Sequence, residues 1–209
     1  MAITIYQNYL KLLIKYYEWR SKIEIWEKLI FSFIGAFLIG ITAQIKINLP
    51  WTPVPIVGST FGVVLTSVLL GRNWGAISTI IYVLLGSIGI PWFAGFTGGL
   101  NIIIGPTGGY LLGFILASYF IGYVIDKFPK SRNFIPLTLI MIISHLILIY
   151  IPGLIQLSLW YVLAMGKEFD FVKILWMGAI PFIPGDIIKS IFAALAVYFI
   201  TPKEKDIKI

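Results

Sequence analysis

Long apolar segments recur along almost the whole chain and constrain its fold more than any other feature. Each is about as long as the 17–25 residues that a helix needs to cross a bilayer. Only 12% of the residues are charged, against about 25% in soluble domains. We therefore expect an all-α integral membrane protein with six transmembrane helices, irregular extracellular Pro/Gly-rich loops and a broken last helix. No separate soluble catalytic domain fits beside six spans in 209 residues.

The spacing of apolar and charged residues predicts three regions. Residues 1–28 form an amphipathic, basic extension, which we interpret either as a helix lying on an anionic leaflet or as an ordinary cytoplasmic tail. Residues 29–202 form the six-helix membrane domain that binds substrate, and residues 203–209 form a charged cytoplasmic tail. The spans are expected at about 29–47, 56–70, 74–90, 106–125, 134–151 and 171–201, with 153–166 too short to span alone.

The basic residues predict the orientation of the chain. If the N-terminus is cytoplasmic, twelve of them lie inside and three lie outside, which follows the positive-inside rule. The inner set is Lys11, Lys15, Arg20, Lys22, Lys28, Arg72, Lys127, Lys130, Arg132, Lys203, Lys205 and Lys208, and the outer set is Lys46, Lys167 and Lys173. Both termini are thus expected on the cytoplasmic side of the plasma membrane, and the uncharged loops 48–58 and 91–105 on the outer side. The net charge of +7 reflects this topology, so we expect no nucleic acid partner.

The sequence does not contain the residues or motifs that several kinds of catalytic and metal site require. The chain has no cysteine and one histidine, His145, which we interpret as a buried residue bonded to a neighbouring helix. It has no HExxH motif, no GxSxG motif and no GxxxxGK[ST] phosphate loop. We therefore expect no metal site, no cofactor and no enzymatic activity, and the chain cannot be the ATPase of any system to which it belongs.

Asp186 and Lys189 are the only charged residues between Ile174 and Thr201. A charge at bilayer depth is costly, and a spacing of three places both on one helix face. Pro181, Pro184 and Gly185 interrupt the helix just before them. A broken helix with an acid and a base at membrane depth is typical of a polar ligand site. The alternative is an internal ion pair that only holds helices together.

The two charges indicate a small molecule with an anionic end and an end rich in N–H groups. Lysine pairs with a carboxylate or phosphate, and aspartate accepts hydrogen bonds from N–H groups. Aromatic residues and glycines would cover an apolar body. Further polar candidates, each of which has packing or helix capping as an alternative role, are Asn101, Thr107, Tyr110, Gln44, Ser59 and Thr60.

Small residues also follow helical spacing on two spans. Ser32, Ala36 and Gly40 form a stripe on which another helix can pack closely, either within this chain or in another subunit. A second stripe, on the fourth span, comprises Gly105, Gly109, Gly113 and Ala117.

Four motifs resemble, in order, those of the BioY family. They are Pro50-Trp51-Thr52-Pro53-Val54-Pro55-Ile56 with Thr60-Phe61-Gly62; Gly86-Ser87-Ile88-Gly89-Ile90-Pro91-Trp92-Phe93-Ala94-Gly95 with Gly98-Gly99-Leu100; Gly105-Pro106-Thr107-Gly108-Gly109-Tyr110-Leu111-Leu112-Gly113-Phe114; and Pro181-Phe182-Ile183-Pro184-Gly185-Asp186 with Lys189. The resemblance covers about residues 43–194. Ser59 and Thr97 depart from the pattern, which affects the expected ligand contacts.

The resemblance implies a six-helix bundle that binds biotin from outside, as the substrate-binding S component of an energy-coupling factor (ECF) transporter. Its partners would be a transmembrane coupling subunit and two cytoplasmic ATPases, besides the lipid bilayer. Lys189 would hold the valerate carboxylate and Asp186 the ureido N–H groups, with no second cation evident. The other expected ligand-binding residues are Asn101, Thr107, Tyr110, Gly98 and Gly99, and Ser32, Ala36 and Gly40 resemble the surface that meets the coupling subunit. An S component for another small vitamin and a stand-alone biotin carrier are the alternatives.

Overall fold

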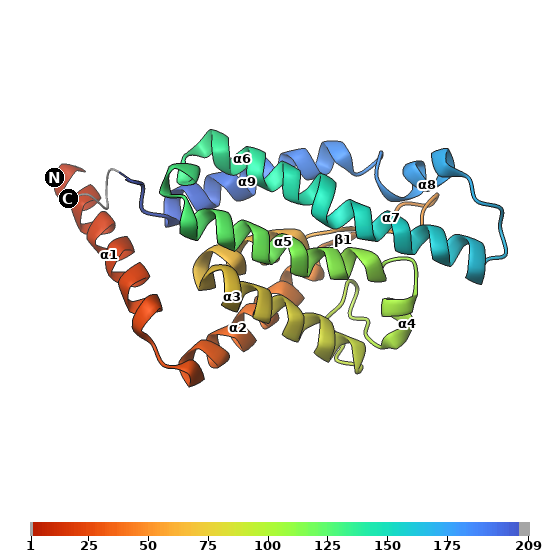
Figure 1. Ribbon diagram of the computed structural model, residues 1–209, viewed down its shortest axis with the longest axis horizontal. Helices are drawn as coiled ribbons and strands as arrows, with labels where there is room; N and C mark the ends of the chain where they lie inside the picture. The colour runs from red at the N-terminus through yellow and green to blue at the C-terminus, as the bar shows by residue number, and fades with distance from the viewer. Residues whose placement is uncertain (1, 205–209) are drawn as a thin grey trace.

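The computed structural model describes residues 2–204 and shows an elongated bundle of helices (Figure 1). The helices are α1 (Ala2–Lys22), α2 (Ile25–Ala43), α3 (Ser59–Ser87), α4 (Leu100–Ile104), α5 (Gly108–Lys127), α6 (Phe134–Ile143), α7 (Tyr150–Leu159), α8 (Phe171–Gly178) and α9 (Ile183–Ile200). A 3-10 turn, η1 (Pro129–Arg132), and two π-helical segments, η2 (Ser144–Ile149) and η3 (Trp160–Ala164), connect some of them. The strands β1 (Lys46–Ile47) and β2 (Ile56–Val57) form a short antiparallel pair. The predicted tail at 203–209 lies mostly outside the described residues.

Five helical segments in the described part of the chain are long and apolar enough to cross a membrane: Ile25–Ala43, Ser59–Ser87, Gly108–Lys127, Phe134–Ala164 and Phe171–Ile200. The second of these is folded back on itself. Gly71 has φ +79°, which breaks the helix. A Cβ at Gly75 would lie only 2.6 Å from the Cα of Ser67, so the arms on either side of Gly71 pack against each other. This confirms the predicted turn at Gly71, although Arg72 and Asn73 are already helical.

One predicted boundary is wrong. We expected a span to end near Ile151 and a separate short piece to follow, but the helix continues from Phe134 to Ala164. The π-helical segment η2 ends three residues before Pro152, whose ring nitrogen cannot donate the hydrogen bond of a regular helix. The wider turns allow the helix to pass the proline instead of ending there.

The last span is broken, as predicted, although its break lies slightly earlier than expected. Helix α8 ends at Gly178, residues 179–182 form turns, and α9 begins at Ile183. Pro184 and Gly185 belong to the first turn of α9, where a proline loses no intrahelical hydrogen bond. Asp186 therefore lies one turn from the start of a helix, at the break.

The stripe of small residues on α2 packs inside the molecule. Ser32 and Ala36 are fully buried, and a Cβ at Gly40 would lie 3.1 Å from Trp92. Ser32, Ala36 and Gly40 therefore pack against this chain's own helices, which is the first of the two alternatives given for the stripe, and the expected exposed surface for a coupling subunit is corrected. The opposite face of α2 is the exposed one, and it carries large apolar residues such as Phe33 and Phe37.

The stripe on α5 permits an equally close contact with η2 and α7. A Cβ at Gly109 would lie 2.0 Å from the carbonyl oxygen of Pro152, and one at Gly113 would lie 2.6 Å from the Cα of Ile149. Gly105 does not belong to this contact, since it precedes α5 and lies against the carbonyl of Asn101. Only glycine allows the two backbones to approach this closely.

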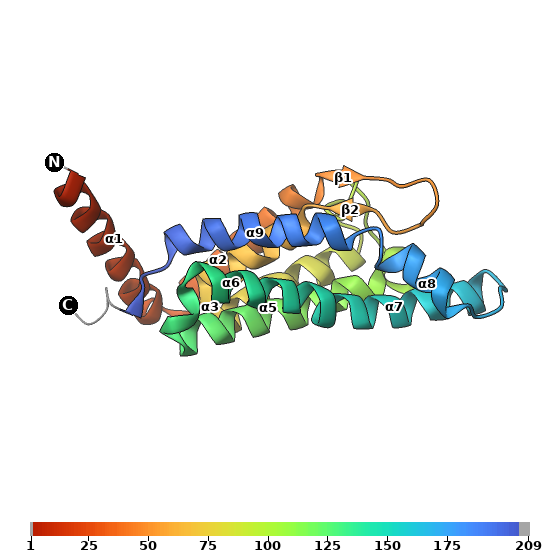
Figure 2. The same cartoon turned by 90° about the horizontal axis from the view of Figure 1, so that it is seen from above.

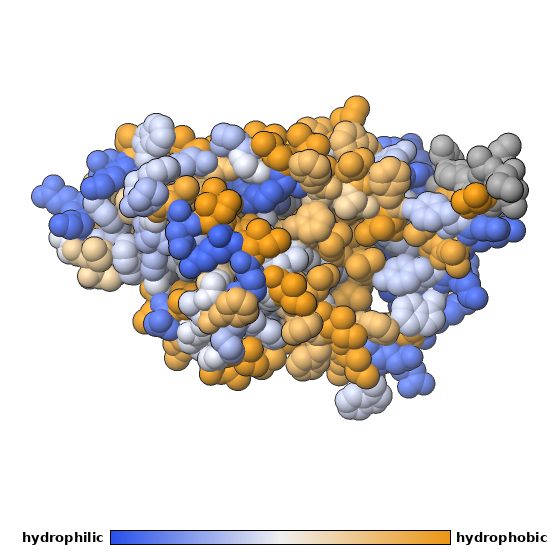
Figure 3. All heavy atoms as spheres, turned by 180° about the vertical axis from the view of Figure 1, so that it is seen from behind, coloured by the Kyte–Doolittle hydropathy of each residue, from blue (hydrophilic) through white to orange (hydrophobic). Residues whose placement is uncertain are grey.

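The two ends of the bundle differ. Both termini and α1 lie at one end, whereas the strand pair, α4 and α8 lie at the other (Figures 1 and 2). Figure 3 shows hydrophobic residues over much of the middle of one face and hydrophilic residues toward the ends. Helix α1 leaves the bundle at an angle and is fastened by Arg20, which lies 2.7 Å from Asp126 and donates to the carbonyl of Val68 at 2.9 Å.

Candidate functional site

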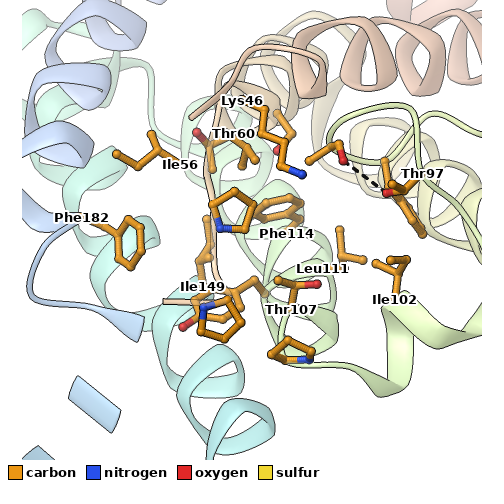
Figure 4. A pocket seen from close by; sticks show the side chains of 18 of the residues that line it. Lys46, Ile56, Thr60, Thr97, Ile102, Thr107, Leu111, Phe114, Ile149 and Phe182 are labelled. Atoms are coloured by element: carbon orange, nitrogen blue, oxygen red, sulfur yellow. Dashed lines mark hydrogen bonds between the residues drawn. The ribbon is translucent and has the colours of Figure 1, made fainter. Parts of the chain in front are cut away.

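A cavity of about 270 Å³ lies in the half of the bundle that is remote from the termini. The strand pair, the loop after α3 and the first turns of α3, α5 and α9 surround it, together with η2 and the start of α7. Figure 4 shows its apolar walls, to which Ile56, Phe114, Ile149 and Phe182 contribute. The volume is at the lower end of the roughly 300–1,000 Å³ that small-molecule sites occupy.

Asp186 reaches this cavity from the first turn of α9, where a negative charge is favourable. The residue is only 6% exposed. Its Oδ1 lies 2.5 Å from Nζ of Lys189, and its Oδ2 accepts a hydrogen bond from the hydroxyl of Tyr150. Both carboxylate oxygens thus have a partner, which satisfies the charge that burial would otherwise penalise.

Lys189 lies one turn further along α9 and also lines the cavity. Besides its ion pair with Asp186, its Nζ donates to the carbonyl oxygen of Val57 at 3.3 Å. This contact joins α9 to β2, which is 132 residues away along the chain. The charge of Lys189 is therefore already balanced within the protein.

Three of the predicted ligand-binding residues line the cavity with this pair: Asn101, Thr107 and Tyr110. Tyr110 offers its ring to the cavity, while its hydroxyl donates to the carbonyl of Gly178 at 2.8 Å and so ties α5 to α8. Ser59 and Thr60, at the start of α3, line the cavity as well.

Three other candidates, Gly98, Gly99 and Gln44, do not line the cavity. Gly98 and Gly99 shape the loop before α4, and a Cβ at Gly98 would lie 2.6 Å from the carbonyl oxygen of Ile90. The amide of Gln44 organises the neighbouring loop, since it donates to the carbonyl of Trp92 at 3.1 Å and accepts from the N–H of Phe96 at 2.8 Å.

The sequence reasoning missed several residues of the cavity. Lys46 was counted only as an outer-loop charge, and Tyr150 was not considered. His145 was expected to be a buried residue, and it is: its Nδ1 lies 2.8 Å from the carbonyl of Met141 and 3.3 Å from the hydroxyl of Ser190 on α9. It also lines the cavity. A helical spacing of five between His145 and Tyr150 falls on one face only because η2 is π-helical.

Two buried polar atoms in the cavity wall have no hydrogen-bond partner within residues 2–204. They are Oγ1 of Thr60 and Nε2 of His145. Unpaired buried polar atoms are rare because each is costly. Both residues line the cavity, although the two atoms themselves are buried.

The Pro-rich loop between the strands closes the site on one side. Pro53 and Pro55 line the cavity, and Thr52 donates a hydrogen bond to the carbonyl of Met177 near the end of α8. This loop belongs to residues 48–58, which were expected outside the membrane. Its bond to α8 places it against the break that precedes Asp186.

The fold and the cavity define a multi-pass membrane protein with an internal site for a small polar ligand. Comparison with known families then identifies the family of the chain. The profile described as the BioY family matches residues 16–205. The chain belongs to the BioY family.

Curated relatives and one solved structure agree with this assignment. The "Probable biotin transporter BioY" of Methanothermobacter thermautotrophicus is 47% identical over 140 residues, which is 67% of this chain and 89% of that protein. The "Biotin transporter BioY" of Thermotoga maritima is 37% identical over 161 residues, or 77% and 89% of the two chains. A crystal structure described as the S-component for biotin from an ECF-type ABC transporter superimposes with a TM-score of 0.72 at 28% identity, covering 82% of this chain and 89% of that one.

Proposed function

We propose that this protein captures biotin for uptake across the cytoplasmic membrane, as the S component of an ECF-type transporter. The observation that carries the proposal is the cavity at the broken last span, which the paired Asp186 and Lys189 line together with Thr60 and His145. The names of the curated relatives and of the solved structure support biotin as the ligand.

Asp186 is proposed to accept hydrogen bonds from the ureido N–H groups. A carboxylate accepts N–H donors strongly when it is ionised, and the ammonium of Lys189 lies 2.5 Å from this one. Asn101, Thr107 and the ring of Tyr110 would complete the polar and aromatic wall around the ligand. The apolar side chains of Phe114 and Ile149 would cover the body of the ligand.

The proposed partners are a transmembrane coupling subunit and two cytoplasmic ATPase subunits. The chain carries no phosphate-loop motif, so the energy of ATP would have to come from other chains. The alternatives are a stand-alone biotin carrier and an S component for another small vitamin. Co-purification of ATPase subunits from native membranes distinguishes the first alternative.

We also propose six crossings with both termini in the cytoplasm. Counting the two arms of α3 on either side of Gly71 separately turns five membrane segments into six. Helix α1 would then lie along the cytoplasmic leaflet. Because the chain has no cysteine, single cysteines introduced at positions 8 and 167 would report opposite sides to an impermeant maleimide.

The test of the proposed ligand is radiolabelled biotin binding to the purified full chain in detergent, beside Asp186→Asn. Tight binding that the variant loses would support both the ligand and the site. Unlabelled thiamine and riboflavin at excess serve as controls and are expected not to compete. A well-folded chain that binds no biotin would refute the proposed ligand for the chain by itself, and displacement by another vitamin would favour that alternative.

A further inference from the structure

The charges in the cavity wall do not cancel. Within the described part of the chain, the lysines and the carboxylate that line it are Lys46, Lys189 and Asp186, which sum to +1. Asp186 and Lys189 neutralise each other at 2.5 Å. The side-chain ammonium of Lys46 has no hydrogen bond or ion pair with any other residue between 2 and 204. The cavity thus contains one surplus positive charge, which matches a ligand with one negative charge.

The position of Lys46 directs this charge into the cavity. Lys46 is half-buried in β1 and pairs with Val57 of β2, the residue whose carbonyl oxygen accepts from Lys189. Its side chain passes over Gly95, where a Cβ would lie 3.1 Å from Nζ and 3.2 Å from Cδ. Figure 4 shows the amine end of Lys46 pointing into the cavity. A larger residue at 95 would occupy the path of the lysine.

The amine of Lys46 and the carboxylate of Asp186 reach the cavity from two different elements, β1 and the first turn of α9. Lys46 lies beside Gly95, and Figure 4 shows it in the cavity wall between Phe182 and Thr97. A ligand bound at both points would have its N–H groups at Asp186 and its anionic end at Lys46.

We propose that Lys46 forms the carboxylate-binding subsite of this cavity. Asp186, balanced by Lys189, then recognises the N–H-rich end of the same ligand. This inference rests on the proposed function and replaces Lys189 as the expected partner of the carboxylate, since Lys189 is already paired. The ligand class is a small monocarboxylate whose other end carries adjacent N–H donors.

The test compares two ligands on matched variants of the full chain in lipid nanodiscs. The ligands are radiolabelled biotin and its neutral amide, the variants are Lys46→Met, Lys46→Arg and Lys189→Met, and the control is Lys167→Met, an exposed lysine that does not line the cavity. We expect Lys46→Met to weaken binding of the free acid about 10- to 100-fold, the effect of losing a hydrogen bond between charged groups. Binding of the amide should change less than about threefold, and Lys46→Arg should restore most of the acid affinity.

Two results would refute the role of Lys46 as the carboxylate-binding residue and leave the proposed function standing. One is normal binding of the free acid by Lys46→Met combined with a selective loss in Lys189→Met. The other is an equal loss of acid and amide in a Lys46→Met chain that unfolds at the wild-type temperature, because that pattern marks a packing role. If the wild-type chain itself bound neither biotin nor the amide, the proposed function would fail, and the subsite with it.

Discussion

Replacing Asp186 with asparagine removes one charge from the pair at the broken span and leaves its shape almost unchanged. In the wild type, Nζ of Lys189 lies 2.5 Å from the carboxylate, and Tyr150 donates to the other oxygen. In Asp186→Asn, Lys189 keeps the carbonyl of Val57 at 3.3 Å and at most a neutral amide oxygen at position 186, so no negative charge balances it. The variant therefore shows how far an unbalanced charge at Lys189 lowers the free energy of unfolding.

The degree of burial sets the expected magnitude. Removing one partner of a fully buried pair costs about 3–5 kcal/mol, and an exposed pair contributes about 0–1 kcal/mol. The side chains here are 8% exposed for Asp186 and 25% for Lys189, so the pair falls between these limits. We expect Asp186→Asn to lower the free energy of unfolding by about 2–3 kcal/mol, or roughly 30- to 150-fold in the equilibrium at about 1.4 kcal/mol per tenfold.

A double-mutant cycle measures this coupling. Unfolding would be followed by tryptophan fluorescence during titration with SDS, for wild type, Asp186→Asn, Lys189→Met and the double variant. We expect the double variant to be at least about 1 kcal/mol more stable than the sum of the single effects predicts, because neither charge is left alone. Asp170→Asn, an exposed helix cap that asparagine can replace, is the control and should be nearly neutral. Additive effects of the two single variants would refute the balanced pair.

Three further predictions concern packing and the α1 anchor. Gly109→Ala should destabilise the bundle by about 1–3 kcal/mol in the same titration, because its Cβ would lie 2.0 Å from a backbone oxygen. The control is Gly185→Ala, which has open space around the added Cβ and should be tolerated. Equal effects of the two variants would contradict the packing argument. Arg20→Met should release α1 by removing the contact to Asp126, seen as faster amide hydrogen exchange in α1, and unchanged exchange would show that other contacts hold it. Burial raises the pKa of Tyr17 to about 12, so the unfolded chain loses the phenol proton at a lower pH than the folded chain. The free energy of unfolding should therefore fall by about 1.4 kcal/mol per pH unit between roughly pH 10 and 12. Tyr17→Phe should reduce that slope, and an unchanged slope would refute the assignment to Tyr17.

Features that depend on local chemistry were predictable from the sequence. Apolar length and composition indicated a helical membrane protein, and the break before Asp186 followed from the prolines that precede it. The glycine turn at Gly71 was predictable for the same reason, since a backbone with φ +79° is one that glycine adopts readily. The pairing of Asp186 with Lys189 followed from their spacing on a helix.

Features that depend on what faces a side chain across the fold were not predictable in this way. The spacing of Ser32, Ala36 and Gly40 indicates close packing but does not say whether the packed surface is internal, and the structure buries it. The length of the helix that contains Pro152 was underestimated, because a π-helical segment absorbs the proline without ending the helix.

The sequence by itself determined the class of protein, the order of its apolar segments and the one helix that carries charge into the membrane. These follow from hydrophobicity, backbone geometry and residues within one turn of each other. Only the tertiary structure decided which residues share the cavity. Lys46 and Lys189 are far apart along the chain, and they meet at the two sides of Val57 because a two-residue strand pair and the start of α9 pack together. Long-range contacts of this kind depend on how helices pack, which spacing along one segment does not encode.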